Sequence, residues 1–310
     1  MKIIFFGTPL FAAETLKELI KNKHEIVATV TTKNKITGRK HNKIKNPVKE
    51  CALENNIRHI ETESLNDHFF TEELKSYNAD LFVVVAFKKL PRNIWEIPNK
   101  GTINLHASLL PEYKGAAPIN RVLINGEVET GLTTFFINER IDSGDIILQE
   151  KLNISNNMTA GQLHNISIKK GCNLLNKTIL LIRNNSAIRL KQKSINSNKI
   201  APKLKKELFR INWKEQPHTI HNLIRGLSPY IENEKFLKDV SIFPSAWFIL
   251  KDAKQNQKRI KIQLSKIKES TIHSNHLDID TDNETYLNIY IHNKKLSILY
   301  LQPEGKKIMN

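Results

Sequence analysis

The stretch NLHASLLPEYKGAAPIN, residues 104–120, joins the end of a predicted strand to a loop that is rich in proline and glycine. Asn104 and His106 both belong to the strand-like run TINLH, residues 102–106. Residues i and i+2 of a strand project from the same side, so the amide and the imidazole can face one common space. A polar pair that only caps a strand end would look the same. The pair alone therefore leaves a structural and a catalytic role open.

The residues before this stretch alternate between apolar runs and amphipathic segments. Helices are predicted from Thr8, as the cap, to Lys21 and again near 47–55, after the cap-plus-proline pair at Asn46. Strands are predicted at KIIFF (2–6), EIVATVTT (25–32), IRHI (57–60) and DLFVVVAF (80–87). Strands that alternate with helices indicate a parallel, doubly wound, Rossmann-like α/β sheet. Such sheets bind ligands at the carboxyl ends of their strands, which is where Asn104 and His106 are expected.

A carboxylate follows in the segment ERIDSG, which joins the strand-like runs GLTTFFIN and DIILQEKLNI. Asp142 is expected in a tight turn there. An amide, an imidazole and a carboxylate suit acyl transfer to an amine. The Asn104 amide can donate to a developing oxyanion and the His106 ring can accept a proton. Asp142 can orient the imidazole and raise its basicity.

The second half of the chain changes character. A helix is predicted over 158–184, and polar, basic residues without periodicity follow it. Beyond them, one helical stretch precedes several short strand-like runs, which favours a small β-barrel of the oligonucleotide-binding type. We therefore expect a catalytic domain over 1–188, a basic linker over 189–207 and a C-terminal OB-like domain over 208–310.

Charge indicates a polyanionic partner. The 310 residues carry 48 Lys and Arg against 31 Asp and Glu, a net charge of +17. Most of the basic residues are lysine, so a biased genome composition also explains part of the excess. Three dense clusters, at 33–49, 189–210 and 251–268, favour a nucleic-acid partner over that alternative.

Other classes of protein are excluded or disfavoured. The opening FFGTPLFA has one glycine where a dinucleotide fingerprint needs three, and no phosphate-binding loop motif exists. Two cysteines without metal spacing and scattered histidines give no metal site. No stretch is long enough to span a bilayer. We expect a cytoplasmic protein that binds no metal and no membrane.

The stretch NLHASLLPEYKGAAPIN and the later segment ETGLTTFFINERIDSGDII together resemble the formyltransferase family that uses 10-formyltetrahydrofolate. The opening FFGTPLFAAETL, the run VVVAFKKLP and the tail LQPEGKKIM extend the resemblance over the whole chain. It implies a catalytic trio, a wall of the folate pocket and a basic loop that contacts tRNA. The residues concerned are, respectively, Asn104, His106 and Asp142; Ser108, Leu109, Leu110 and Pro111; and Arg39, Lys40 and Lys43.

The resemblance is closest to members that formylate the methionine carried by initiator tRNA. It implies a monomer that takes 10-formyltetrahydrofolate as formyl donor and initiator methionyl-tRNA as acceptor. Alternatives keep the sheet and change the acceptor to glycinamide ribonucleotide, an amino sugar or water. A non-catalytic RNA-binding relative is a further alternative of another class.

Overall fold

The computed structural model describes residues 1–33, 46–193, 199–233, 235–237, 242–251, 255–269, 277–282 and 284–310. The predicted tRNA-contacting residues Arg39, Lys40 and Lys43 lie outside the described residues. The chain divides into two compact units. The first contains 1–114, 131–151 and 167–199, and the second contains 115–130, 152–166 and 200–310.

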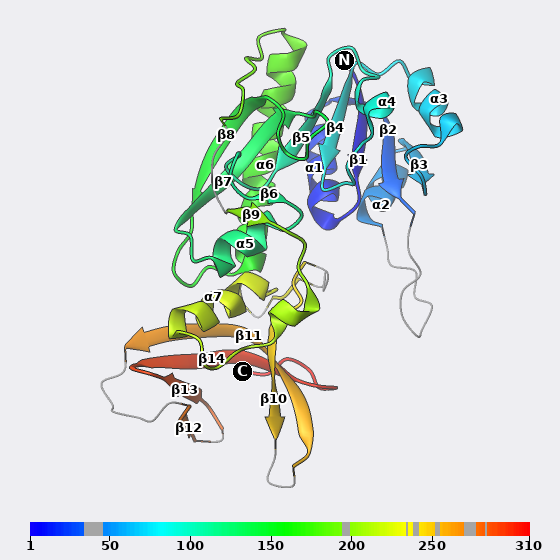
Figure 1. The fold of residues 1–310 in the computed structure, drawn as a ribbon. Helices are drawn as coiled ribbons and strands as arrows, with labels where there is room; N and C mark the ends of the chain where they lie inside the picture. Colours follow the sequence, from blue (N-terminus) through cyan, green and yellow to red (C-terminus); the bar gives the residue numbers. More distant parts are fainter. Residues whose placement is uncertain are drawn as a thin grey trace. The chain divides into compact units, whose positions relative to one another are not determined.

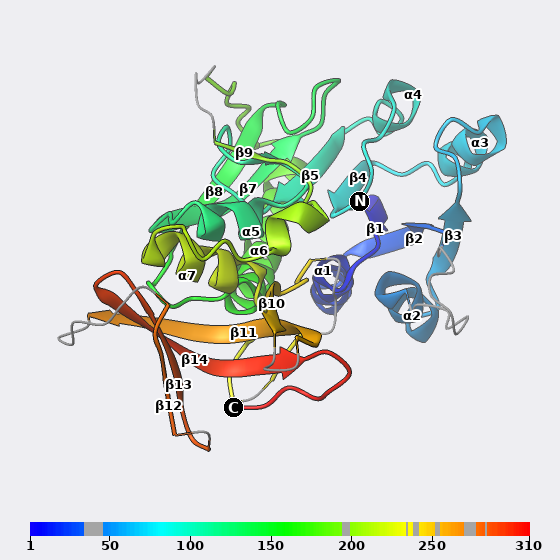
Figure 2. The ribbon, with the colours of Figure 1, turned by 60° about the horizontal axis from the view of Figure 1, so that its bottom comes forward.

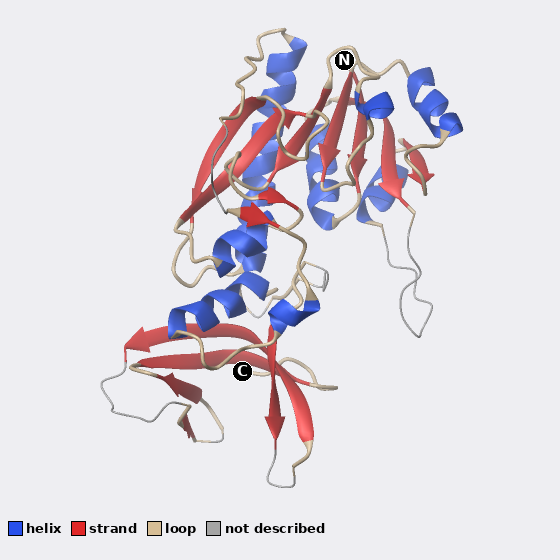
Figure 3. Ribbon diagram, viewed as in Figure 1, coloured by secondary structure: helices blue, strands red, loops and turns tan. Residues whose placement is uncertain are grey.

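A seven-stranded sheet forms the centre of the first unit, in the order β3-β2-β1-β4-β5-β7-β8 (Figures 1 and 3). Its strands are β1 (Lys2–Gly7), β2 (Glu25–Thr32), β3 (Arg58–Thr62), β4 (Leu81–Val85), β5 (Thr102–His106), β7 (Glu129–Phe136) and β8 (Ile146–Asn153). Strands β1 to β5 pair in parallel, whereas β7 runs antiparallel to β5. The predicted doubly wound parallel sheet is confirmed, with an antiparallel extension beyond β5.

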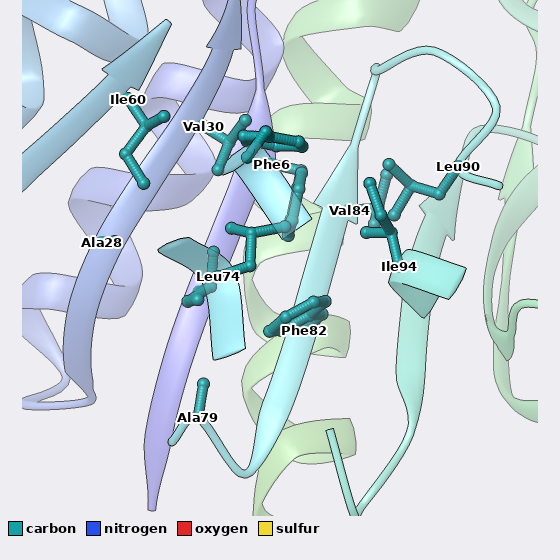
Figure 4. Packing of buried hydrophobic residues seen from close by; sticks show 12 residues of the cluster. Phe6, Ala28, Val30, Ile60, Leu74, Ala79, Phe82, Val84, Leu90 and Ile94 are labelled. Carbon is teal, nitrogen blue, oxygen red and sulfur yellow. The ribbon is translucent and has the colours of Figure 1, made fainter. Parts of the chain in front are cut away.

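Helices cover both faces of this sheet (Figure 2). They are α1 (Leu10–Lys21), α2 (Pro47–Glu54), α3 (His68–Ser76), α4 (Arg92–Trp95) and α6 (Ala160–Arg183). Alternate strand residues face opposite layers. Phe6 and Phe82 pack under α3 and α4 with Leu74 and Ile94 in one buried cluster (Figure 4). Burial on both faces explains why the strands read as continuous apolar runs.

Two helix starts were predicted from capping signals, and one prediction was wrong. Asn46 caps α2, accepting a hydrogen bond from the backbone N–H of Lys49 at 3.3 Å. Helix α1 begins at Leu10 with Pro9 at its cap position and no side-chain cap. The hydroxyl of Thr8 instead accepts from the backbone N–H of Thr32 at 3.5 Å, because the neighbouring strand β2 ends beside it.

The second unit is built on a five-stranded sheet in the order β10-β11-β14-β13-β12. Its strands are β10 (Ala246–Lys251), β11 (Gln257–Glu269), β12 (Ile279–Thr281), β13 (Leu287–Ile291) and β14 (Lys294–Pro303). These five strands pair with one another in antiparallel fashion, which confirms the predicted C-terminal β domain. The short strand β12 was not anticipated from the sequence.

Two helices and a short 3-10 helix complete the second unit. Helix α7 (Pro217–Leu227) lies on the sheet, α5 (Pro118–Ile124) packs against α7, and a short 3-10 helix spans Lys206–Phe209. Ile220 and Ile224 of α7 are buried against Ile262 and Ile298 of the sheet. Two-residue strands β6 (Lys114–Gly115) and β9 (Ile200–Ala201) pair with each other. Among the described residues, no helix is long and apolar enough to cross a membrane.

Candidate active site

Strand β5 presents the predicted amide and imidazole at its carboxyl end. It lies between β4 and β7, with Asn104 opposite Val84 on one side and Phe135 on the other. His106 is the last residue of the strand and is 7% exposed, while Asn104 is half-buried. The structure therefore places the pair at the carboxyl end of β5, as the sequence predicts.

The two ring nitrogens of His106 have different surroundings. Nε2 lies 2.9 Å from the backbone oxygen of Tyr113, and Nδ1 lies 3.8 Å from Oδ2 of Asp142. A carbonyl oxygen only accepts hydrogen bonds, so Nε2 carries the hydrogen in this contact. Nδ1 of the neutral ring then has a lone pair directed toward the carboxylate side. The structure thus brings His106 and Asp142 together, as the sequence suggested.

The turn that carries Asp142 is held in an unusual conformation. Asp142 has a φ of 50°, in the left-handed region that is uncommon for residues with a side chain. Two residues later, a Cβ on Gly144 would lie 1.6 Å from the backbone oxygen of Phe136, so only glycine fits. The side-chain amide of Gln192 donates to the backbone oxygens of Asp142 and Gly144, at 3.0 and 2.9 Å.

Gln192 is a residue that the sequence reasoning missed. It belongs to the polar segment that was interpreted as a linker, and no periodicity marks it. Gln192 is separated from Asp142 by about fifty residues in the sequence, and neither segment by itself predicts that the two are in contact. Nearby, the backbone of Leu190 pairs with Ile146 at the start of β8. The guanidinium of Arg189 lies 3.9 Å from the Phe136 ring centroid. The beginning of this segment is therefore part of the first unit.

Lys114 is a second charged group at the turn. Its ammonium donates to the hydroxyl of Ser143 at 3.0 Å, next to Asp142. Partial burial lowers the pKa of Lys114 below its ordinary value, although the nearby Asp142 carboxylate acts in the opposite direction. This ammonium gives the turn a second attachment besides Gln192.

A cavity of about 640 Å³ opens beside the same turn. Its lining is Arg92, Trp95, Lys114, Asn138, Glu139, Arg140, Ser143, Gln192 and Lys193. Four of these side chains are cationic and one is a carboxylate, and Trp95 supplies an aromatic surface. Such a lining suits an anionic ligand that also carries aromatic rings.

The predicted folate wall, residues 108–111, is tightly fixed but is not part of this lining. Ser108 and Leu110 are 0% and 3% exposed, whereas Leu109 and Pro111 are half-buried. The hydroxyl of Thr133 donates to the Ser108 carbonyl at 2.7 Å and accepts from the Leu110 N–H at 3.1 Å. These contacts fix the segment against β7 and leave two of its four side chains accessible.

Comparison with known proteins shows the family. A model described as Formyl transferase matches residues 1–179. A second, described as Formyl transferase, C-terminal domain, matches residues 203–310. The chain belongs to the formyl transferase family. Members transfer a formyl group, so the protein is an enzyme of one-carbon transfer, as the resemblance implied. In the described residues, no group of His, Cys, Asp and Glu is arranged to hold a metal ion.

Two family members with assigned names align along nearly their whole length. The chain is 42% identical over 309 residues to the methionyl-tRNA formyltransferase of Flavobacterium johnsoniae, covering 100% of this chain and 93% of the relative. It is 36% identical over 313 residues to the enzyme of the same name from Bacteroides thetaiotaomicron, covering 99% and 92%.

Solved structures include formyltransferases with a different acceptor. One is WlaRD, a sugar 3N-formyl transferase in the presence of dTDP and 5-N-formyl-THF, with a TM-score of 0.66 and 26% identity. The structural alignment covers 99% of this chain and 99% of that chain. The N-formyltransferase from Helicobacter canadensis, in complex with folinic acid and dTDP-3-aminofucose, has a TM-score of 0.67. Its 24% identity, over 96% of this chain and 98% of that one, shows a shared fold.

Proposed function

We propose that this protein transfers the formyl group of 10-formyltetrahydrofolate to the α-amino group of methionine on initiator tRNA, for translation initiation. The observation that carries the proposal is the full-length alignment, across both domains, with relatives named methionyl-tRNA formyltransferase. The sugar formyltransferases share the fold at lower identity, 24% and 26%. An amino-sugar acceptor is therefore the second candidate.

The trio formed by Asn104 and His106 of β5 and by Asp142 of the turn between β7 and β8 supplies the groups that the transfer needs. The amine nitrogen attacks the formyl carbon, a C–N bond forms, and the carbonyl oxygen develops negative charge that the Asn104 amide stabilises. His106 accepts the proton from the amine, and Asp142 stabilises the imidazolium. The bond from carbon to N10 of the carrier then breaks, and the proton passes to the departing nitrogen.

The formyl donor in this proposal is a folate, and no metal takes part. The cavity beside the Asp142 turn combines cations with Trp95, and folate combines carboxylates with aromatic rings. Leu109 and Pro111, the partly exposed members of the predicted wall, would contact the donor. Ser108 and Leu110 are buried and would hold that segment in place. The folate carries the activated group itself, so the protein supplies binding, orientation and electrostatics.

Recognition of tRNA is proposed for the remaining basic parts of the chain. We assign catalysis to residues 1–188, the connection to 189–207 and tRNA binding to 208–310. Arg39, Lys40 and Lys43 complete the proposed contact set. A monomer in the cytoplasm fits this assignment.

Competition between acceptors tests the function. Purified protein is given 10-formyltetrahydrofolate labelled in the formyl group, together with methionyl-tRNA, glycinamide ribonucleotide, a dTDP-amino sugar or water. We expect label on methionyl-tRNA, with kcat/KM at least a hundredfold above that for the other acceptors. Preferential labelling of the amino sugar would replace the proposal with its alternative.

A further inference from the structure

Three residues of different character alternate along one face of strand β7. They are Gly131, Thr133 and Phe135, and their spacing makes all three project from the same side of the strand. In the register with β5, Thr133 lies opposite His106, and Phe135 lies opposite Asn104. Residues opposite each other on neighbouring strands project from the same side of a sheet. This face of β7 therefore shares one side of the sheet with the proposed catalytic pair.

The Thr133 hydroxyl binds the backbone of the segment 108–111 at two points. It donates to the Ser108 carbonyl at 2.7 Å and accepts from the Leu110 N–H at 3.1 Å. It also accepts from the side-chain amide of Gln149 at 2.9 Å, and the same amide donates to the Leu110 carbonyl at 2.8 Å. A hydroxyl has one hydrogen and two lone pairs, so these contacts use its whole capacity. Side chains of β7 and β8 thus hold both backbone polar groups of Leu110.

The other two residues of this face fit the side chains of the segment. A Cβ on Gly131 would lie 2.4 Å from Cδ2 of Leu109, so the absence of a side chain leaves room for the leucine. Phe135 is 1% exposed and packs with Leu110 in one buried cluster. Leu109 and Pro111 remain accessible, and they are the members of the segment that would contact the donor. The face of β7 therefore sets the position of these two side chains.

We propose that Thr133 and Gln149 are positioning residues for the formyl donor, which they serve by holding the wall that the donor binds. The inference rests on the proposed function, since that function supplies the donor. A wall that is ordered before binding spares the donor the cost of ordering it, and this raises affinity. Loss of the Thr133 hydroxyl removes the partner of two backbone groups, at Ser108 and Leu110, and favours other positions of the segment.

Thr134 offers a comparison with a hydroxyl that serves only the core. It is as fully buried as Thr133, and its hydroxyl lies 2.7 Å from that of Thr178 on α6. It projects from the other face of β7, because side chains alternate along a strand. Valine at either position keeps the shape and removes one buried hydroxyl. A loss of stability alone would therefore affect both variants, whereas a disturbed donor wall would affect only Thr133→Val.

Direct binding of 5-formyltetrahydrofolate, measured without an acceptor, tests the proposal. Thr133→Val should raise Kd about tenfold, and Gln149→Met about threefold, because the wall is no longer ordered before binding. Thr133→Ser keeps the hydroxyl and should restore Kd to within about twofold of wild type. Thr134→Val should also stay within about twofold, although its melting temperature should fall as much as that of Thr133→Val.

Kinetics give a second readout that a merely structural role would not change. In Thr133→Val, KM for 10-formyltetrahydrofolate should rise by the same factor as Kd. The value of kcat at saturating donor and KM for methionyl-tRNA should stay within about threefold of wild type, as expected when only donor binding is weakened. Gln149 is exposed, so Gln149→Met provides the same test if Thr133→Val does not fold.

The binding measurement separates this inference from the proposed function, because no acceptor takes part in it. If the wild type prefers an amino sugar, yet Thr133→Val weakens folate binding, the acceptor assignment fails and the positioning role stands. If Thr133→Val and Gln149→Met bind the folate as tightly as the wild type, the positioning role fails and the function stands. A wild type that binds no folate would overturn both.

Discussion

The imidazole Nδ1 of His106 lies 3.8 Å from Oδ2 of Asp142, while its Nε2 is held by the carbonyl of Tyr113 at 2.9 Å. The Tyr113 contact keeps the ring hydrogen on Nε2, so a proton accepted by the ring is accepted at Nδ1. The resulting imidazolium faces the carboxylate and gains an ion pair that the neutral ring lacks. Asp142 is therefore placed to stabilise the imidazolium that forms when His106 acts as the base.

The first prediction concerns this ion pair. Asp142→Asn keeps the shape of the side chain and removes its charge, so kcat should fall roughly 10²–10⁴-fold, the range for a positioned acid–base group. Turnover with methionyl-tRNA measures the effect. Asp145→Asn is the matched control, because Asp145 lies in the same segment and is equally half-buried. Its turnover should remain within about threefold of wild type; a similar loss in both variants would contradict the assignment.

The second prediction separates the amide from the imidazole. Asn104→Ala should reduce kcat roughly 10²–10³-fold, because one donor to the oxyanion is lost. The melting temperature should change little, since Asn104 is only half-buried at a strand end. A rate close to wild type, in a variant of unchanged stability, would remove Asn104 from the mechanism.

Local patterns predicted much of the fold. Continuous apolar runs gave β1, β2 and β4, and the Asn46 cap placed the start of α2, because strand burial and capping act within a few residues. The error at Thr8 has a local cause as well. Its hydroxyl had two competing partners, the helix N–H groups and the backbone of Thr32, and only the packed structure shows which one it meets.

The site was predictable in part. Side chains alternate along a strand, so the sequence alone places Asn104 and His106 on the same face. Asp142 was recognisable in its Asp-Ser-Gly turn. The contacts of Gln192 and Lys114 with that turn depend on tertiary packing between distant segments. Neither the residue types nor their spacing in the sequence predicts these contacts.

The third prediction tests Gln192. Gln192→Met keeps the length of the side chain and removes two hydrogen bonds to the turn, each contributing about 1 kcal/mol. With Asp142 less well placed, kcat should fall about tenfold, whereas KM for methionyl-tRNA should change less than twofold. Gln149→Met, which removes a side-chain amide bound to Leu110, is the comparison. A change in KM alone for Gln192→Met would contradict a positioning role.

The fourth prediction concerns the basic loop. Replacing Arg39, Lys40 and Lys43 together with Ala should raise KM for methionyl-tRNA and leave folate affinity unchanged, because three cations near phosphates are lost. The salt slope of tRNA binding should fall by about three. Lys177→Ala, an exposed lysine on α6, should change neither quantity. If folate affinity fell by a similar factor, these three residues would instead belong to the binding site of the formyl donor.

The fifth prediction concerns stability against pH in the second unit. His221 is 2% exposed, with Nδ1 3.0 Å from the hydroxyl of Ser265 and Nε2 3.1 Å from the backbone oxygen of Asn156. The carbonyl accepts from Nε2 and the hydroxyl donates to Nδ1, so the neutral ring satisfies both partners. Burial, with smaller contributions from the nearby Arg225 and His218 charges, lowers the pKa of His221 to about 4, although the hydrogen bond to the Asn156 backbone acts in the opposite direction.

The sign of the effect follows from proton binding. An unfolded histidine binds its proton near pH 6.5, whereas the folded one does so only near 4. Between these values the unfolded chain holds more protons, so stability falls as pH falls. From pH 7 to pH 5 the loss from His221 should be about 2 kcal/mol. His221→Gln retains a donor and an acceptor without a titrating group, so it should lose about 2 kcal/mol less.

Urea denaturation at pH 7 and pH 5 measures the difference between the two proteins. His68→Gln, at the exposed start of α3, removes a histidine outside this network and should retain the wild-type loss. The comparison uses the change between two pH values, so a constant destabilisation by the glutamine cancels. Equal losses in wild type and His221→Gln would mean that His221 takes up its proton in the folded protein without penalty.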